Sequence, residues 1–371
     1  MSIPGELNPP VRILLGPGPS EVHPRILRAM ATPLLGHLDP CFLEIMDETR
    51  SMLRQFFRTV NELTFPISAT GSAGMETCLV NLLEPADQAL VCANGVFGNR
   101  MCDIVQRCGA QLVRVDAPWG SPVDPQDVKK ALQKCRPKLV AIVHAETSTG
   151  VLQPLEEVSR LAHEAGALFV VDTVTSLAGT EVRVDDWGID AVYSATQKCL
   201  GAPPGLSPAS FSKRAVDAIE NRKTKVQSWY LDLSLVRKYW GQERVYHHTA
   251  PISSIYALRE SLRIVLEEGL ESRFARHRKN HELLRDGLES LGFEFLAAPE
   301  FRLPMLNAVK IPTGLEDGPS RKMLLDRFNI EIGAGLGELA GKLWRIGLMG
   351  YSSSENNVRL LLSAIAEIKG K

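Results

Sequence analysis

Short apolar runs alternate with amphipathic segments along residues 63–215 of the chain. We expect strands at 63–67, 88–92, 111–115, 138–144, 168–172, 191–194 and 206–211. Apolar positions at helical spacing predict helices between them, at 75–83, 101–108, 124–135 and 154–166. Strands that are apolar nearly throughout are typical of a parallel sheet covered by helices on both faces. The pattern therefore predicts an α/β fold with a mainly parallel sheet.

The pattern changes after residue 212, where irregular aromatic-rich segments lead into two helices at 255–291, interrupted near Gly269. Short strands at 293–297, 305–311, 329–332 and 343–348 follow, and a last helix begins at Ser354. Residues 1–20 are rich in proline and glycine, which predicts an irregular arm over the surface. The expected organisation is an N-terminal arm (1–20), a large domain (21–255) and a smaller C-terminal α+β domain (256–371).

Composition narrows the class of protein only slightly. The 371 residues are 44% hydrophobic and 23% charged, with a net charge of −1, so no overall field favours nucleic acid or an anionic membrane. No apolar run approaches the roughly 20 residues of a membrane span, and the first residues lack the pattern of a signal peptide. The seven cysteines have no CxxC spacing. We therefore expect buried, reduced thiols in a cytoplasmic protein.

Two residues of complementary chemistry stand just beyond two of the predicted strands. Asp172 ends the run Leu168–Val171, and Lys198 follows the next run, Ala191–Tyr193. The carboxyl ends of parallel strands meet at one edge of a sheet, where open α/β sheets bind their ligands. We therefore expect a carboxylate and an amine to face one cleft.

A loop of small and hydroxyl residues, Ser68 to Gly74, connects a predicted strand to a predicted helix. Free backbone N–H groups at the helix N-terminus, with the hydroxyls of Thr70 and Ser72, would form a cradle for an anion. Simple N-capping of the helix by serine or threonine explains the same residues equally well. The hydrolase motif G-x-S-x-G is not matched, because Thr70 stands where it needs glycine.

Three further positions are candidates for binding. Phe97 lies in a predicted glycine-flanked loop, where it would stack on a planar ring or simply pack in the core. Arg345 lies on a predicted strand between apolar neighbours, so it must be paired or directed at an anion. His37 occupies a predicted turn and either touches substrate or is merely exposed.

The adjacent pair His247–His248 has no third ligand at suitable spacing, so we expect no metal site.

These parts match what pyridoxal phosphate (PLP) requires: a phosphate cradle, a stacking ring, a carboxylate for the pyridine nitrogen and a lysine for the aldehyde. The chain resembles the class V, fold-type I aminotransferases, most of all the alanine–glyoxylate and serine–pyruvate group. The resemblance covers nearly the whole chain and is carried by a series of motifs in this order: Leu15–Pro19, Cys92–Gly95, Glu146–Val151, Val171–Val174, Gln197–Lys198, Ala202–Gly205, Tyr246–Thr249 and Arg345–Gly347.

The resemblance implies a role for each matching position. Lys198 would form the Schiff base and Asp172 would pair with the pyridine nitrogen, while Val174 would pack on the ring. The remaining cofactor-binding positions would be Thr70, Gly71, Ser72 and Gln197 at the phosphate, Phe97 on the ring and Thr147 at the cofactor's hydroxyl. Arg345 would bind the substrate carboxylate and Gly18 would line the small substrate pocket.

Two of the matching positions imply a second subunit. Tyr246 and Thr249 correspond to residues that contact the neighbouring subunit's phosphate in the family, which implies a homodimer with shared active sites. The chain departs from the family at two others. Many relatives have tryptophan where Phe97 stands, and animal relatives have histidine where Ser72 stands, so donor and acceptor preferences stay open.

The resemblance implies a transaminase that moves an amino group from alanine or serine to glyoxylate or pyruvate by a ping-pong mechanism. Two alternatives remain: a transaminase with another donor such as a kynurenine, and a non-catalytic subunit of a complex. Deaminase or decarboxylase chemistry on the same scaffold also stays open. A cysteine desulfurase is disfavoured, because Cys199 directly follows Lys198 and no cysteine lies in an exposed glycine-flanked loop. A nicotinamide dehydrogenase is disfavoured, because the glycine-rich stretch Gly333–Gly341 lies late and has the wrong spacing. The role of that stretch in selectivity stays open, as does any assembly beyond a dimer.

Overall fold

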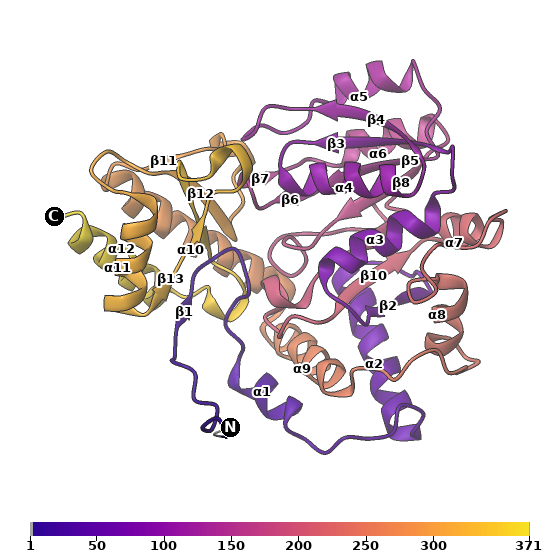
Figure 1. The fold of residues 1–371 in the computed structure, drawn as a ribbon, viewed down its shortest axis with the longest axis horizontal. Helices are drawn as coiled ribbons and strands as arrows, with labels where there is room; N and C mark the ends of the chain where they lie inside the picture. The colour runs from indigo at the N-terminus through magenta and orange to yellow at the C-terminus, as the bar shows by residue number, and fades with distance from the viewer. Residues whose placement is uncertain (1–2, 371) are drawn as a thin grey trace.

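The structure is a computed structural model that describes residues 3–370. Met1 and Ser2, which open the predicted arm, and Lys371, which closes the predicted small domain, lie outside these residues. Figure 1 shows two parts: a larger one around a seven-stranded sheet, and a smaller one, orange to yellow, around a four-stranded sheet.

The large sheet has the strand order β2-β10-β9-β8-β5-β3-β4. Of these seven strands only β10 runs against the others. Its strands are β2 (Leu63–Ile67), β3 (Gln88–Ala93), β4 (Gln111–Asp116), β5 (Leu139–Val143), β8 (Leu168–Asp172), β9 (Ala191–Tyr193) and β10 (Ser207–Phe211). The central strands β5, β8 and β9 are buried at every position, which explains their unbroken apolar sequences. The predicted mainly parallel sheet is confirmed.

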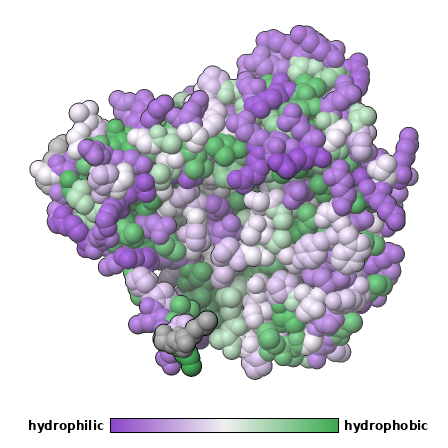
Figure 2. Space-filling view, viewed as in Figure 1, coloured by the Kyte–Doolittle hydropathy of each residue, from purple (hydrophilic) through white to green (hydrophobic). Residues whose placement is uncertain are grey.

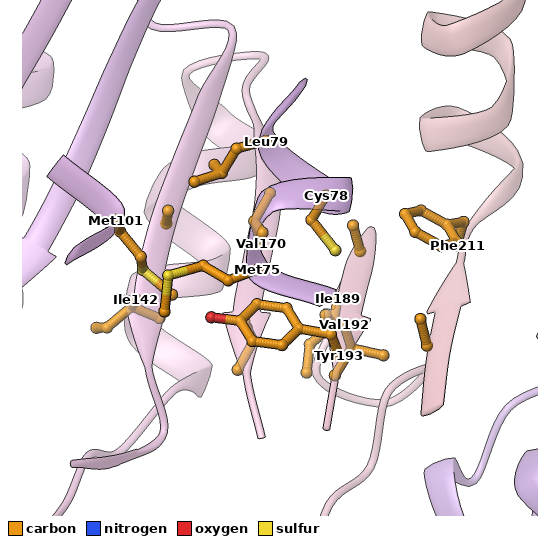
Figure 3. Packing of buried hydrophobic residues seen from close by; sticks show 14 of the residues in the cluster. Met75, Cys78, Leu79, Met101, Ile142, Val170, Ile189, Val192, Tyr193 and Phe211 are labelled. Atoms are coloured by element: carbon orange, nitrogen blue, oxygen red, sulfur yellow. The ribbon is translucent and has the colours of Figure 1, made fainter. Parts of the chain in front are cut away.

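Helices cover this sheet, and α1, α2 and α9 lie below it in Figure 1. The helices are α1 (Pro24–Met30), α2 (Pro40–Phe57), α3 (Gly71–Leu82), α4 (Val96–Arg107), α5 (Pro125–Leu132), α6 (Glu156–Glu164), α7 (Lys213–Glu220), α8 (Leu233–Trp240) and α9 (Ile252–Glu268). Helices α3 and α4 pack against each other in front of the sheet, and α5 and α6 form a second packed pair. Figure 3 shows the Met75 side chain of α3 extending toward Met101 of α4 and Ile142 of β5, within the buried cluster that also includes Cys78 and Leu79 of α3. This packing sets α3 over the sheet with its N-terminus near the ends of β8 and β9.

The smaller part has its own buried cluster, which includes Trp344 and Leu361. Its helices are α10 (Leu270–Ser290), α11 (Asp317–Phe328) and α12 (Glu355–Ile368), and its antiparallel sheet contains β11 (Glu294–Phe295), β12 (Leu306–Lys310), β15 (Leu343–Gly347) and β14 (Gly333–Ala334). The predicted break between α9 and α10 is confirmed at Gly269, whose φ of 81° favours glycine. The exact bounds of the two predicted domains stay a prediction.

The prediction that residues 1–20 form an arm over the surface is wrong for the second half of this segment. Residues 3–11 are exposed, as expected. However, β1 (Ile13–Leu14) pairs with β13 (Ile330–Glu331), and Leu15 is fully buried in the cluster of the smaller part. The apolar triplet Ile13–Leu15 is the reason, because its burial ties the arm to the smaller part before the chain enters the larger one.

A separate two-stranded ribbon, β6 (Ala145–Glu146) with β7 (Val151–Leu152), lies beside the large sheet. Figure 2 shows the face of Figure 1 in space-filling form, with hydrophilic residues over most of both parts and hydrophobic ones scattered among them. Within residues 3–370, no helix has the length and apolar character needed to cross a bilayer.

Candidate active site

A cavity of about 170 Å³ lies at the carboxyl ends of β5 and β8, beside the N-terminus of α3. Many of the predicted site residues line it: Gly71, Ser72, Phe97, Thr147, Asp172, Val174, Gln197 and Lys198. The predicted carboxylate and amine therefore do face one cavity. Five lining residues were not predicted from the sequence, namely Met75, Arg100, Val143, Ala145 and Thr175.

Asp172 lies at one end of this cavity, as the last residue of β8. Its Oδ2 accepts a hydrogen bond of 2.7 Å from the hydroxyl of Tyr193, and its Oδ1 accepts one of 2.7 Å from the amide of Val174. Figure 3 shows the Tyr193 ring within the core beneath α3. Burial raises the pKa of Asp172 to about 6, although both hydrogen bonds act in the opposite direction. The carboxylate is therefore held rigidly and remains mainly ionised at pH 7.

Lys198 belongs to a π-helical turn, Thr196–Leu200, and has non-helical dihedral angles (φ −99°, ψ −128°). Carbonyl oxygens of this turn also accept hydrogen bonds from residues outside it. The hydroxyl of Ser20 donates to the carbonyl oxygen of Lys198 at 2.9 Å, and the Ser20 amide donates to that of Gln197 at 2.9 Å. The end of the N-terminal arm thus holds the lysine-bearing turn.

The same turn is held from the other side by two long helices. Ser261 of α9 donates its hydroxyl to the carbonyl oxygen of Leu200 at 2.6 Å. Arg273 of α10 donates from Nη2 to the carbonyl oxygen of Cys199 at 2.6 Å, and it is only 4% exposed. Sequence reasoning missed Ser20, Ser261 and Arg273, because each lies far along the chain from the residue that it holds.

The amine of Lys198 is buried and donates a hydrogen bond to the carbonyl oxygen of Pro17. Burial, with a smaller repulsion from Arg345, lowers the pKa of Lys198 to about 8. Gly18 packs so closely over this side chain that a Cβ atom there would lie 2.6 Å from Nζ. The N-terminal arm therefore covers the amine and leaves little space beside it.

The N-terminus of α3 supplies unpaired backbone donors to the cavity. Thr70 occupies the N-cap position, but its side chain makes no capping hydrogen bond, so N-capping does not explain this loop. A Cβ atom on Gly71 would lie 2.8 Å from the Cβ of Ala195, so only glycine fits at this close approach. Ser72 accepts a hydrogen bond of 3.0 Å from Arg100. The amides of Gly71 and Ser72, the first two residues of α3, have no backbone acceptor within residues 3–370, and both residues line the cavity.

Phe97 lies in the first turn of α4 rather than in a loop, so the prediction of a helix beginning near Met101 is wrong. The reason is a cap from another segment. The buried carboxylate of Glu146 accepts hydrogen bonds from the amides of Phe97 (3.1 Å) and Gly98 (3.3 Å), and the hydroxyl of Ser148 accepts one from Val96 (3.0 Å). Residues on both sides of Thr147 therefore start the helix that carries Phe97.

Arg345 lies on β15, is 7% exposed, and donates from Nε to the carbonyl oxygen of Ala334 at 2.7 Å. Burial lowers its pKa to about 10. It does not line the cavity, but its charge acts on Lys198. The stretch Gly333–Gly341 thus supports Arg345 through β14; its role in selectivity stays a prediction.

The structure does not bring Tyr246 and Thr249 to this cavity. Both are exposed, and the Tyr246 ring lies 5.1 Å from that of His37. His37 also lies away from the cavity and accepts a hydrogen bond of 2.8 Å from the hydroxyl of Tyr239 through its backbone oxygen. The roles predicted for these residues depend on a second subunit and stay predictions.

The residues present fit PLP. Two buried polar atoms near the cavity, Oε1 of Gln197 and Oγ1 of Thr175, have no hydrogen-bond partner among residues 3–370. They accompany a carboxylate at one end, an amine at the other and free helix amides, which is the set of groups that PLP engages. By contrast, the Cys199 thiol is fully buried, and burial raises its pKa to about 12, which argues against a desulfurase nucleophile. No cluster of three metal-ligating residues occurs in the described part of the chain.

Comparison with known proteins gives the family. Residues 28–360 match the model of the class V aminotransferases. The chain is 41% identical to the (S)-ureidoglycine–glyoxylate transaminase of Bacillus subtilis (98% of this chain, 92% of the relative) and 42% identical to the alanine–glyoxylate aminotransferase of Rattus norvegicus (97% and 88%). The crystal structure of an alanine–glyoxylate aminotransferase from Nostoc superposes with a TM-score of 0.97 at 48% identity, covering 99% of this chain and 97% of that one. The predicted fold-type I architecture is confirmed, and the chain belongs to the class V aminotransferase family.

Proposed function

We propose that this protein is a PLP-dependent transaminase that moves the amino group of a small amino acid, alanine or serine, to glyoxylate or pyruvate. The observation that carries the proposal is that Asp172 and Lys198 line the same cavity, in a chain of the class V family. The relatives named above act on glyoxylate, which supports a small keto acid as acceptor.

The cofactor, when bound, supplies an electron sink that makes the Cα–H bond of the amino acid acidic. Asp172 stays ionised beside Tyr193 and Val174 and keeps the pyridine nitrogen protonated. The amine of Lys198 removes the proton from Cα and returns it later. Its lowered pKa suits this role, because a neutral amine is more available near neutral pH than for an ordinary lysine. Because the keto acid formed from the donor leaves before the acceptor keto acid binds, while the amino group stays in the site, we expect ping-pong kinetics.

Substrate size is limited by the arm. Arg345 does not line the cavity but its charge reaches Lys198, and only its Nε is used within residues 3–370, so its two Nη groups can hold the substrate carboxylate as a bidentate partner. Pro17 and Gly18 lie against Lys198 and leave room for a short side chain only. A second donor, (S)-ureidoglycine, is favoured by the name of the Bacillus subtilis relative. Donors with bulky aromatic side chains, such as kynurenines, fit this geometry poorly.

A half-reaction screen tests this proposal. The purified holoenzyme is mixed with one amino acid at a time, and conversion of the cofactor to its amine form is followed by absorbance. Alanine, serine or ureidoglycine should convert it within seconds to minutes, and glyoxylate should restore it. Conversion by kynurenine alone contradicts the small-donor proposal, and a protein that binds no cofactor contradicts the whole assignment and favours a non-catalytic subunit.

A homodimer with shared active sites is part of the proposal. Its support is that Tyr246 and Thr249 are exposed in a segment that also exposes Trp229 (62%) and Tyr230 (39%). Subunits carrying Lys198→Ala and subunits carrying Thr249→Ala are mixed under exchange conditions. With shared sites, the hybrid contains one fully intact site and regains activity, whereas sites confined to one subunit give no recovery.

The last part of the proposal is that the protein is located in the cytoplasm. All seven cysteines are free, and six of them are buried, as expected in a reducing compartment. Cell fractionation with an antibody against the protein tests this location.

A further inference from the structure

The phosphate end of the proposed cofactor site raises a question of charge. A phosphate ester carries about −1.5 to −2 charges at pH 7. The predicted partners within one subunit, Thr70, Gly71, Ser72 and Gln197, are all neutral, and so are Tyr246 and Thr249, which are expected from the neighbouring subunit. A helix N-terminus is equivalent to only about +0.5 charge. Most of the negative charge is therefore unmatched by the residues that the sequence points to.

Arg100 is placed to supply the missing charge. It lines the cavity together with Gly71 and Ser72. Its Nη1 donates a hydrogen bond of 3.0 Å to the hydroxyl of Ser72, in the first turn of α3. No carboxylate within residues 3–370 forms a salt bridge with Arg100, so its charge is available to a ligand.

The position of the guanidinium is fixed by Phe97, one turn earlier on α4. The Cζ atom of Arg100 lies 4.8 Å from the centroid of the Phe97 ring, a cation–π arrangement. A planar guanidinium held against a ring keeps its N–H groups at its edge, where they can bind phosphate oxygens in pairs. Phe97 thus has two contacts to make, with the cofactor ring and with Arg100.

The other cationic side chains near the site, Lys198 and Arg345, do not supply the positive charge for the phosphate. Lys198 is the amine at the aldehyde end, and Arg345 does not line the cavity and donates to the backbone of Ala334. We infer that Arg100 is a direct ligand of the cofactor phosphate and that Phe97 and Ser72 hold its guanidinium in place. This inference rests on the proposed function, because it takes PLP as the ligand.

The test compares two ligands that differ only in the phosphate. Apoprotein is prepared from the full chain, and the dissociation constants of PLP and of pyridoxal are measured by fluorescence titration. Arg100→Gln should weaken PLP binding by about 10- to 100-fold, the usual effect of losing a charge-assisted hydrogen bond, and leave pyridoxal binding unchanged. Arg100→Lys keeps the charge without the planar fork, so its PLP affinity should fall between those of the wild type and Arg100→Gln.

A control on the same helix separates this role from general electrostatics. Arg107 is exposed on α4 and pairs with Asp103 at 2.7 Å, away from the cavity. Arg107→Gln should bind both ligands as the wild type does. Inorganic phosphate should compete with PLP for the wild-type apoprotein and compete less well for the Arg100→Gln variant.

Several results overturn the inference. If Arg100→Gln weakens PLP and pyridoxal equally, Arg100 acts through Phe97 or through folding and not on the phosphate. If it weakens neither, the phosphate charge is met elsewhere. A melting temperature close to that of the wild type checks that the Arg100→Gln variant is folded. Arg100→Lys keeps the positive charge, so it tests the same role with a smaller change to the protein. If the wild type binds neither ligand, the proposed function fails together with this inference, whereas the other two outcomes leave the proposed function intact.

Discussion

The two ends of the cavity are built in different ways. Asp172 is held by Tyr193 and Val174, which lie on the adjacent strand and two residues further along the chain. The turn that bears Lys198 is held by Ser20 of the arm, Ser261 of α9 and Arg273 of α10. The carboxylate is thus fixed by the sheet itself. The position of the Lys198 amine depends on how the arm and the long helices pack against the sheet. Substitutions far from the cavity should therefore disturb Lys198 more than Asp172.

The largest effect is expected at Arg273. Its loss leaves two buried carbonyl groups without a donor, those of Ala178 and Cys199, and one partner fewer for Glu268. Arg273→Met should therefore lower the free energy of unfolding by about 3 kcal/mol and slow attachment of the cofactor to Lys198. Chemical denaturation and the rate of holoenzyme formation measure these effects.

Arg276 provides a matched control on the same helix. It pairs with the same Glu268 but donates to the carbonyl groups of Gly350 and Ser353 instead of the lysine-bearing turn. Arg276→Met should destabilise the protein without changing the attachment rate. Equal slowing by both variants would mean that stability, and not the hold on the turn, sets the behaviour of Lys198.

Asp172→Asn tests the opposite end. The amide keeps the shape and a hydrogen-bond acceptor but loses the charge that faces the pyridine nitrogen. Turnover should fall by about 100-fold or more, as for other single electrostatic groups in active sites, while the protein stays folded and binds cofactor. Steady-state kinetics and cofactor content measure this, and turnover close to that of the wild type would remove Asp172 from the mechanism.

Asp172 and Lys198 should also make contributions to the stability of the apoprotein that change with pH in opposite directions. The folded-state pKa of Asp172, about 6, exceeds its ordinary value of 3.8, so the apoprotein binds more protons than the unfolded chain between these values. Its stability should fall as pH rises from about 4 to 6, by roughly 2 to 3 kcal/mol from this group. Lys198, with a pKa lowered to about 8 from 10.5, should cost stability as pH falls from about 10 to 8.

Denaturation of the apoprotein across this pH range checks both signs. The stability of Asp172→Asn relative to the wild type should rise between pH 4 and 6 and then level off. That of Lys198→Met should rise as pH falls from 10 to 8. A flat difference for either variant would mean that burial does not shift the pKa of that residue.

The smallest effect is expected at Ser261. Removing its hydroxyl leaves the carbonyl group of Leu200 without this donor, so Ser261→Ala should cost about 1 kcal/mol. Thermal unfolding measures it. A larger loss than for Arg273→Met would reverse the ranking of the contacts that hold the turn.

The sequence allowed prediction of what depends on local pattern. The parallel sheet follows from apolar runs such as Leu168–Val171, and the loop before α3 follows from its small residues. Three features escaped because their causes lie far along the chain. Glu146 starts α4 early and moves Phe97 into a helix, and the buried triplet Ile13–Leu15 ties the arm to the smaller part. Arg100 belongs to no motif in the sequence, and only the fold places it beside Ser72.

The most direct test of the account is to locate the cofactor on the chain. The purified protein is treated with borohydride, digested and analysed by peptide mass spectrometry. We predict that the mass of the reduced cofactor is found on the peptide containing Lys198, and that Lys198→Ala carries no label and has no transaminase activity. Label on another lysine, or a Lys198→Ala variant that still transaminates, would contradict the account.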